Sequence, residues 1–320
     1  MDFDFKPLPF LGNAHVQTLL GNLLPAPAFR FPIRECRVRL ADGDQLLLHE
    51  TTPPSWRPGD RVALLVHGLG GSHRSGYMQR LAQALVRNGM RVARMDLRGC
   101  GRGLPLARRP YHGGCSEDVR ACVADIRRGS PSSAVTLIGF SLGGNIVLKL
   151  AGEAAQRPVD GLERVAALAP PIDFERCAAL LSAPRNHIYE QYFVRGLIRQ
   201  VRQRQRLFPE DAAIRFPRWM TMRRFDDLYT SPRCGFDGAT HYYRSAACLP
   251  LLARIQVPAF ILTARDDPFI AVEPFEELVA PAHIRVMIMP RGGHLGFLGK
   301  SGKGGIRWAE QRIAEWVIEG

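Results

Sequence analysis

The chain has 320 residues, of which 46% are hydrophobic and 23% are charged. A chain of this length and hydrophobic content can bury one large core. We find no internal repeat or low-complexity linker and therefore expect a single domain over residues 1–320. The net charge is +13, but only four of the 43 basic residues are lysines, and the arginines are dispersed along the chain. This dispersion argues against a nucleic-acid partner, whereas weak peripheral attraction to an anionic membrane is compatible with it.

Signals of secretion, membrane insertion and metal binding are missing from the sequence. The start, Met1-Asp-Phe-Asp-Phe5, lacks the basic and then apolar order of a signal peptide, and no apolar run is long enough to span a bilayer. The seven cysteines form no Cys-x-x-Cys pair, which argues for a reducing compartment and against a disulfide framework. We therefore expect a soluble cytoplasmic protein that uses no metal and no cofactor.

Strand-like and helical segments alternate along most of the chain. The first two strands, Cys36–Leu40 and Gln45–Glu50, flank a turn at Ala41-Asp-Gly-Asp44 and predict an antiparallel hairpin. Six apolar strands follow, at Val62–Val66, Val92–Asp96, Ala134–Phe140, Val165–Ala169, Val257–Thr263 and Ile284–Met289. Their alternation with helices predicts an α/β fold with a mostly parallel, eight-stranded sheet, helices on both faces and right-handed crossovers.

A glycine-rich loop follows the first of these six strands, in Val62-Ala-Leu-Leu-Val-His-Gly-Leu-Gly-Gly-Ser72. The loop lacks Gly-x-Gly-x-x-Gly, and neither Lys nor Ser/Thr follows it at the Walker spacing, so it does not indicate a dinucleotide or phosphate site. Glycines instead allow backbone N–H groups to point toward one place, as the stabilisation of an oxyanion requires. We expect the N–H of Leu69 to be one such donor.

The segment Ala134-Val-Thr-Leu-Ile-Gly-Phe-Ser-Leu-Gly-Gly-Asn145 joins an apolar strand to a helical stripe through Gly-x-Ser-x-Gly. This pattern is typical of a nucleophile elbow, in which Gly139 and Gly143 leave space and Ser141 adopts a strained left-handed conformation. The alternative is an ordinary glycine-rich turn, but the strand before it and the helix after it favour the elbow. We predict that Ser141 is the nucleophile and that the N–H of Leu142 is the second oxyanion donor.

The stretch from about residue 171 to residue 249 interrupts the alternation and is helical and rich in arginine and aromatic residues. We interpret it as a cap insertion over the active site. Its segment Val194–Phe208 has five arginines mostly away from one apolar face, which comprises Val194, Leu197, Ile198 and Val201. We favour a cap helix whose apolar face covers an acyl pocket over a helix that lies on a membrane surface.

The partners of a serine nucleophile are expected after it in the order acid, then histidine. His294 lies in a glycine-rich loop directly after a strand, whereas His283 opens that strand, so we predict that His294 is the general base. Asp266 and Asp267 follow the preceding strand side by side. The spacing from the end of that strand favours Asp267 as the residue that orients His294, and Asp266 stays open as the alternative.

With these segments the chain resembles the α/β-hydrolase superfamily, and within it the YheT-like hydrolases, over nearly its whole length. Beyond the serine, aspartate and histidine segments, the resemblance rests on motifs at Asn13–Thr18, Met95–Arg102, Tyr111–Gly114, Phe225–Tyr229, Gly235–Gly238, Tyr242–Tyr243 and Asp266–Phe269. Members of this group include eukaryotic lipid-active α/β-hydrolase-domain proteins and yeast medium-chain ethyl ester synthases/esterases.

The resemblance implies a serine carboxylic-ester hydrolase that acts through an acyl-serine intermediate on short- to medium-chain acyl esters, with monoacylglycerols as one candidate. Some relatives carry a His-x-x-x-x-Asp acyltransferase motif, but no histidine here precedes an aspartate by five positions. Hydrolysis is therefore favoured over acyl transfer to a lysolipid. Two alternatives stay open, which are alcohol-dependent acyl transfer and a non-catalytic binder of lipids or small ligands.

Overall fold

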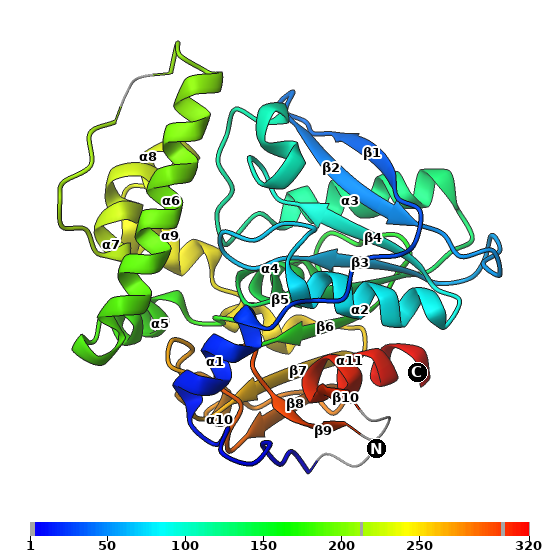
Figure 1. The fold of residues 1–320 in the computed structure, drawn as a ribbon. Coiled ribbons are helices and arrows are strands. Elements are labelled where there is room, and N and C mark those ends of the chain that lie inside the picture. Colours follow the sequence, from blue (N-terminus) through cyan, green and yellow to red (C-terminus); the bar gives the residue numbers. More distant parts are fainter. Residues whose placement is uncertain (1–3, 212–213, 302–304, 320) are drawn as a thin grey trace.

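The computed structural model describes residues 4–211, 214–301 and 305–319, which fold around one eight-stranded sheet (Figure 1). The strands of this sheet are β1 (Arg34–Arg39), β2 (Gln45–Thr51), β3 (Val62–Val66), β4 (Arg91–Asp96), β5 (Val135–Phe140), β6 (Leu162–Leu168), β7 (Ala259–Ala264) and β8 (Ile284–Met289). Their order is β1-β2-β4-β3-β5-β6-β7-β8, with β1 antiparallel to β2, β2 antiparallel to β4, and all other neighbours parallel. The predicted α/β fold with a mostly parallel, eight-stranded sheet is confirmed.

The predicted strand boundaries differ from the observed ones by up to three residues. The entry hairpin is present, and β8 has its predicted limits. β7 starts at Ala259, two residues later than predicted, because Pro258 has no N–H to donate to a neighbouring strand. β6 starts three residues earlier than predicted, at Leu162, because its first two residues are only half-buried and leave no apolar pattern in the sequence.

Helices cover both faces of the sheet, as the alternation of strands and helices predicts. The helices α2 (Gly76–Arg87) and α11 (Trp308–Glu319) pack on one face, and α3 (Ser116–Gly129) and α4 (Leu142–Glu153) pack on the other. Strand β3 illustrates the division, because Ala63 and Leu65 pack with α2 and α11, whereas its other three side chains pack with α3 and α4. All five are fully buried, as expected of a central strand covered on both sides.

The connection between β6 and β7 is helical. It holds α5 (Phe174–Leu181), α6 (His187–Leu207), α7 (Met222–Phe225), a π-helical turn at Asp226–Thr230, α8 (Ser231–Cys234) and α9 (Ala239–Ala246). These helices gather at one side of the molecule (Figure 1). An apolar cluster of their own, distinct from the clusters on the two faces of the sheet, includes residues of α5, α6 and α7 together with Phe269 from the segment after β7.

The N-terminal helix α1 (Ala14–Leu23) packs against the segment that follows β8. Its first turn is capped by Asn13, whose side chain accepts hydrogen bonds from the N–H groups of His15 and Val16. Gln17 exchanges two hydrogen bonds with the backbone of Leu298, at 2.7 and 3.2 Å. The antiparallel pair β9 (Leu298–Ser301) and β10 (Gly305–Arg307) lies next to it, and α10 (Glu273–Glu276) follows β7. Within the described residues, no helix combines the length and the apolar character needed to cross a bilayer.

Candidate active site

Ser141 lies in the sharp turn between β5 and α4, with φ of +50° and ψ of −122°. This left-handed conformation is strained for a residue with a side chain, and it projects the hydroxyl out of the turn. The turn depends on close backbone contacts, because a Cβ on Gly143 would lie 2.3 Å from the carbonyl oxygen of Val66. A Cβ on Gly139 would lie 2.3 Å from the carbonyl oxygen of Gly143. The geometry is that of the predicted elbow.

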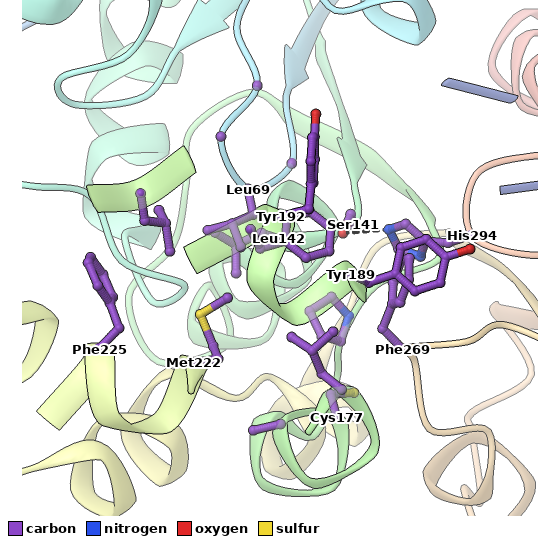
Figure 2. Close-up of a pocket in the computed structure, with 18 of the residues that line it drawn as sticks. Leu69, Ser141, Leu142, Cys177, Tyr189, Tyr192, Met222, Phe225, Phe269 and His294 are labelled. Carbon is purple, nitrogen blue, oxygen red and sulfur yellow. Dashed lines mark hydrogen bonds between the residues drawn. The ribbon is translucent and has the colours of Figure 1, made fainter. Parts of the chain in front are cut away.

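The structure brings Ser141, His294 and Asp267 into one hydrogen-bonded chain, of which Figure 2 shows Ser141 and His294. His294 Nδ1 lies 2.8 Å from Asp267 Oδ2, and His294 Nε2 lies 3.0 Å from Ser141 Oγ. An ionised carboxylate can only accept, so Nδ1 carries the proton and Nε2 accepts from the serine hydroxyl. In this tautomer the imidazole can receive the serine proton.

The two neighbouring aspartates occupy different positions. Asp267 is buried, and its second oxygen accepts from the N–H groups of Phe269 and Ile270 at 2.9 and 3.0 Å. Asp266 does not contact the imidazole and instead accepts from the N–H of Gly293 at 2.9 Å, which ties down the loop that carries His294. His283 lies elsewhere and is hydrogen-bonded to the carbonyl of Ile255.

Helix α1 also holds the His294 loop, a contact that the sequence analysis missed. The N–H of His294 donates to Thr18 Oγ1 at 2.9 Å, and the Thr18 hydroxyl donates to the carbonyl of Ala14 at 2.8 Å. One turn earlier, His15 Nδ1 lies 3.0 Å from the hydroxyl of Tyr189 on α6. The only sign of this contact in the sequence was the motif Asn13–Thr18. The motif does not indicate that an N-terminal helix packs against a C-terminal loop.

Leu69 and Leu142, the predicted oxyanion donors, line the same cavity as Ser141 and His294 (Figure 2). The backbone on both sides of Leu69 is tethered, because the N–H of Gly68 donates to Tyr77 Oη at 3.1 Å and that of Gly70 to Tyr111 Oη at 2.9 Å. Burial raises the pKa of both tyrosines, so their hydroxyls stay neutral. These two tethers orient the peptide that carries the Leu69 N–H.

His67 supports the start of this glycine-rich loop from below. It is fully buried, and burial lowers its pKa, so the ring stays neutral. Nε2 accepts from the N–H of Leu97 at 3.1 Å, which leaves Nδ1 to donate to the carbonyl of Gly68 at 2.7 Å. The ring therefore connects the ends of β3 and β4 beneath the site.

An apolar cavity of about 480 Å³ extends from Ser141. Its walls come from α1 and from the inserted helices, and include Leu181, Leu197, Val201, Met222 and Phe225. The face of α6 that the sequence analysis identified is turned inward, with Val194, Leu197 and Val201 buried. A cavity of this size with mostly apolar walls is typical of a small-molecule site.

One ionisable side chain in the cavity wall stands out. Asp226, in the π-helical turn, is almost completely buried, and burial raises the pKa of its carboxyl to about 6. The hydroxyl of Tyr243 on α9 donates to Asp226 Oδ2 at 2.8 Å. The neighbouring Asp227 accepts from the N–H of Ala239 at 2.7 Å and so caps α9.

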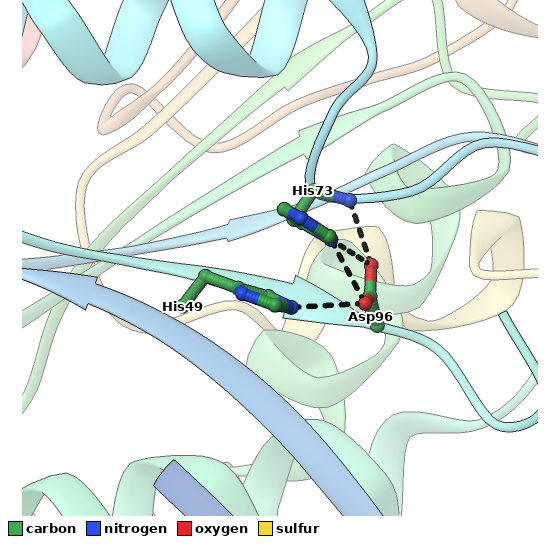
Figure 3. Close-up of side chains that lie close together, drawn as sticks. All are labelled: His49, His73 and Asp96. Atoms are coloured by element: carbon green, nitrogen blue, oxygen red, sulfur yellow. Dashed lines mark hydrogen bonds and ion pairs between the residues drawn. The ribbon is translucent and has the colours of Figure 1, made fainter. Parts of the chain in front are cut away.

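One cluster in the described part of the chain could hold a metal ion, formed by His49, His73 and Asp96 (Figure 3). Asp96 Oδ2 lies 3.0 Å from His49 Nε2 and 2.9 Å from His73 Nδ1, and the carboxylate also accepts from the N–H groups of His73 and Arg102. The two rings are stacked 3.4 Å apart at 16°. Imidazoles that share an ion converge on it within their ring planes, which stacked rings cannot do without moving. The cluster fits a hydrogen-bonded clamp better than a metal site.

The sequence is similar to a known protein family and to several named proteins. A family model described as the alpha/beta hydrolase fold matches residues 62–301. The chain is 30% identical to the Escherichia coli (strain K12) protein named "Putative esterase YheT", over 98% of this chain and 93% of that protein. It is 26% identical to a protein of Saccharomyces cerevisiae (strain ATCC 204508 / S288c) named monoacylglycerol lipase, over 80% of this chain and 58% of that protein.

Solved structures show the same fold. The structure of the Pyrococcus furiosus esterase Pf2001 superimposes with a TM-score of 0.61 and covers 92% of this chain and 97% of its own. The sequences of this pair are only 17% identical, so the similarity concerns the arrangement of strands and helices.

Proposed function

The chain belongs to the α/β-hydrolase family, in its YheT-like group of esterase- or lipase-type members, and we propose that it hydrolyses carboxylic esters through an acyl-enzyme on Ser141. The observation that carries this proposal is the hydrogen-bonded chain from Ser141 through His294 to Asp267 at the mouth of an apolar cavity. A serine hydroxyl is a weak nucleophile without a base, and this chain supplies one.

In the proposed mechanism, Ser141 Oγ attacks the ester carbonyl carbon as its proton moves to His294 Nε2. The negative charge on the carbonyl oxygen is stabilised by the backbone N–H groups of Leu69 and Leu142. His294 then gives the proton to the departing alcohol oxygen as the carbon–oxygen bond breaks. Asp267 holds the imidazole in the tautomer needed and stabilises its charged form.

Water completes the proposed cycle. His294 removes a proton from water, the resulting oxygen attacks the acyl carbon, and the bond to Ser141 Oγ breaks as the serine regains its proton. The acid is released, and the enzyme returns to its starting state. Apart from the ester and water, these steps use only groups of the chain itself.

The proposed substrates are esters of short- to medium-chain acids, with monoacylglycerols as a candidate class. The apolar walls of the cavity favour an acyl chain over a charged group. The segment of residues 171–249 acts in this proposal as the cap of a single domain, because its helices form much of that wall. The name of the yeast relative, monoacylglycerol lipase, agrees with this class.

We also propose that the protein works in a reducing compartment, the cytoplasm. All seven cysteines are unpaired, and five of them are buried. Burial raises the pKa of several of these thiols, including Cys100, Cys177 and Cys234, each to about 12. Protonated, buried thiols are structural rather than reactive.

The test is the initial rate of hydrolysis of p-nitrophenyl esters from acetate to palmitate by the wild type, Ser141→Ala and His294→Ala. We expect a maximum at one chain length and loss of activity in both variants, together with fluorophosphonate labelling of the wild type but not of Ser141→Ala. An active Ser141→Ala protein would contradict the proposal. A wild type that neither turns over esters nor reacts with the label would instead be a lipid binder. Addition of ethanol separates hydrolysis from acyl transfer, because a transferase would yield the ethyl ester.

A further inference from the structure

The outer face of α6 carries an ordered row of side chains that the proposed chemistry does not use. At 3.6 residues per turn, positions spaced alternately by four and three residues share one face of a helix. On α6 this exposed row, here called the α6 stripe, consists of Ile188, Tyr192, Arg195, Arg199, Arg202 and Arg206. The stripe has apolar side chains at the N-terminal end of the helix and only arginines beyond them. It contains no acidic residue.

The four arginines of the stripe have no acidic partner within the described residues, since no carboxylate forms an ion pair with any of them there. The fifth arginine of this helix, Arg204, is different. It is buried on the inward face, donates to the carbonyl of Ala107 at 3.1 Å and pairs with Asp211 at 3.2 Å. The charge of Arg204 is therefore neutralised within the protein, whereas the arginines of the stripe are directed to solvent.

The apolar end of the stripe lies at the mouth of the cavity. Ile188 and Tyr192 are 82% and 66% exposed, yet both also line the cavity that contains Ser141. Leu19 and Leu23 on α1 share this property, with 49% and 70% exposed. Helices α1 and α6 are joined near this point by the contact between His15 and Tyr189. Large apolar side chains thus surround the entrance instead of being buried behind it.

We propose that this surface, the α6 stripe together with Leu19 and Leu23, docks onto the surface of an anionic phospholipid bilayer. Arginine side chains above anionic headgroups are attracted electrostatically, and exposed aliphatic and aromatic side chains enter the boundary between headgroups and acyl chains. The bilayer matches both halves of the surface. A nucleic acid would satisfy the arginines but would leave the apolar rim exposed to water.

Docking in this orientation places the cavity entrance against the lipid. An ester with an acyl chain then passes from the bilayer into the apolar cavity without crossing bulk water, which removes the cost of exposing that chain. This advantage rests on the proposed ester hydrolysis. The docking itself does not, so the two can be tested separately.

The test measures cosedimentation of the Ser141→Ala protein with vesicles of phosphatidylcholine alone or mixed with an equal part of phosphatidylglycerol. In this background, Arg195→Gln/Arg199→Gln/Arg202→Gln should lower binding to the mixed vesicles by roughly tenfold or more. The control Arg37→Gln/Arg39→Gln/Arg87→Gln removes the same charge from exposed positions on β1 and α2, away from α6 (Figure 1), and should bind nearly as the parent does. Added salt should weaken binding of parent and control.

Three outcomes would overturn the proposal. Failure of the parent protein to bind mixed vesicles is one, and an equal loss in the stripe and control variants is another, because net charge alone would then explain binding. The third is a stripe variant that still binds the mixed vesicles but no longer binds duplex DNA, because the stripe would then be a surface for nucleic acid.

Hydrolysis of water-soluble p-nitrophenyl acetate should be unchanged by the stripe substitutions in the protein that retains Ser141. If vesicles are bound but no ester is hydrolysed, the proposed function fails and the docking surface stands.

Discussion

Adjacent residues of one chemical type have separate tasks at this site. Asp267 contacts the imidazole of His294, while Asp266 contacts the backbone of the loop that carries this histidine. The difference follows from direction, since one carboxylate points into the site and its neighbour points toward Gly293. Each aspartate can be replaced by asparagine with little change in shape. The replacement removes the negative charge but keeps an oxygen that accepts a hydrogen bond, so it shows which of the two each contact requires.

We predict that Asp267→Asn lowers kcat by about 10⁴, because the amide can donate to Nδ1 and so favours the wrong tautomer of His294. Asp266→Asn should keep kcat within about tenfold of the wild type, since the amide oxygen still accepts from the N–H of Gly293. Steady-state kinetics with a p-nitrophenyl ester compare the two variants. Equal losses would mean that both aspartates act on the imidazole, against the geometry described above.

The elbow shows how two elements depend on the absence of a side chain. At the serine turn, α4 begins so close to the end of β3 that the space at Gly143 is taken by backbone atoms of β3 and of the loop that follows it. Backbone cannot move aside as the end of a flexible side chain can, so the strand and the helix must separate to admit even a methyl group. The inserted helix α6 offers a contrast, because Gly196 lies within it with open space around its Cα.

We predict that Gly143→Ala lowers the free energy of unfolding by about 2–3 kcal/mol or more, because its Cβ would lie 2.3 Å from the carbonyl oxygen of Val66. Gly196→Ala is the matched control and should raise the free energy of unfolding by about 0.5–1 kcal/mol, since alanine favours helix and nothing lies within 4 Å of the added methyl. Urea denaturation followed by circular dichroism measures both. A neutral Gly143→Ala would show that α4 can move away from the end of β3 at little cost.

The stability of the whole molecule includes the cost of a carboxyl group buried among the inserted helices. Asp226 has its pKa raised from 3.8 to about 6, chiefly by burial. Between these values the folded protein holds a proton that the unfolded chain has released. The free energy of unfolding therefore falls as pH rises through this window, and at higher pH the cost stays constant.

We predict that Asp226→Asn raises the free energy of unfolding by about 1–3 kcal/mol at neutral pH, where the wild type must bury a carboxylate. The amide oxygen can still accept from the Tyr243 hydroxyl, so the contact at this position is kept. Urea midpoints measured between pH 4 and pH 8 should show a difference between variant and wild type that grows up to about pH 6 and then levels off. A difference that does not change with pH would contradict the raised pKa.

The sequence by itself determined the strands, the fold class and the candidate reacting residues, because these depend on local patterns. Apolar strands that alternate with helical stripes predict a parallel sheet, and Gly-x-Ser-x-Gly predicts a turn that only glycines allow. Order along the chain reduced nine histidines to His283 and His294, and the glycine-rich loop favoured His294, which the structure places 3.0 Å from the serine hydroxyl. The spacing from the end of the preceding strand favoured Asp267 over Asp266 but did not decide between them.

Only the tertiary structure decided which side chains support the site from distant parts of the chain. Thr18 holds the His294 loop across 276 positions of sequence, and Tyr77 and Tyr111 tether the loop of Leu69. These contacts leave no periodic pattern, since a single hydroxyl that meets one backbone N–H needs no particular neighbours in sequence. The physical reason is that a hydrogen bond of this kind forms only where two elements pack against each other. Packing brings together residues that are far apart in the sequence, and the sequence pattern within one helix or strand carries no information about such a pair.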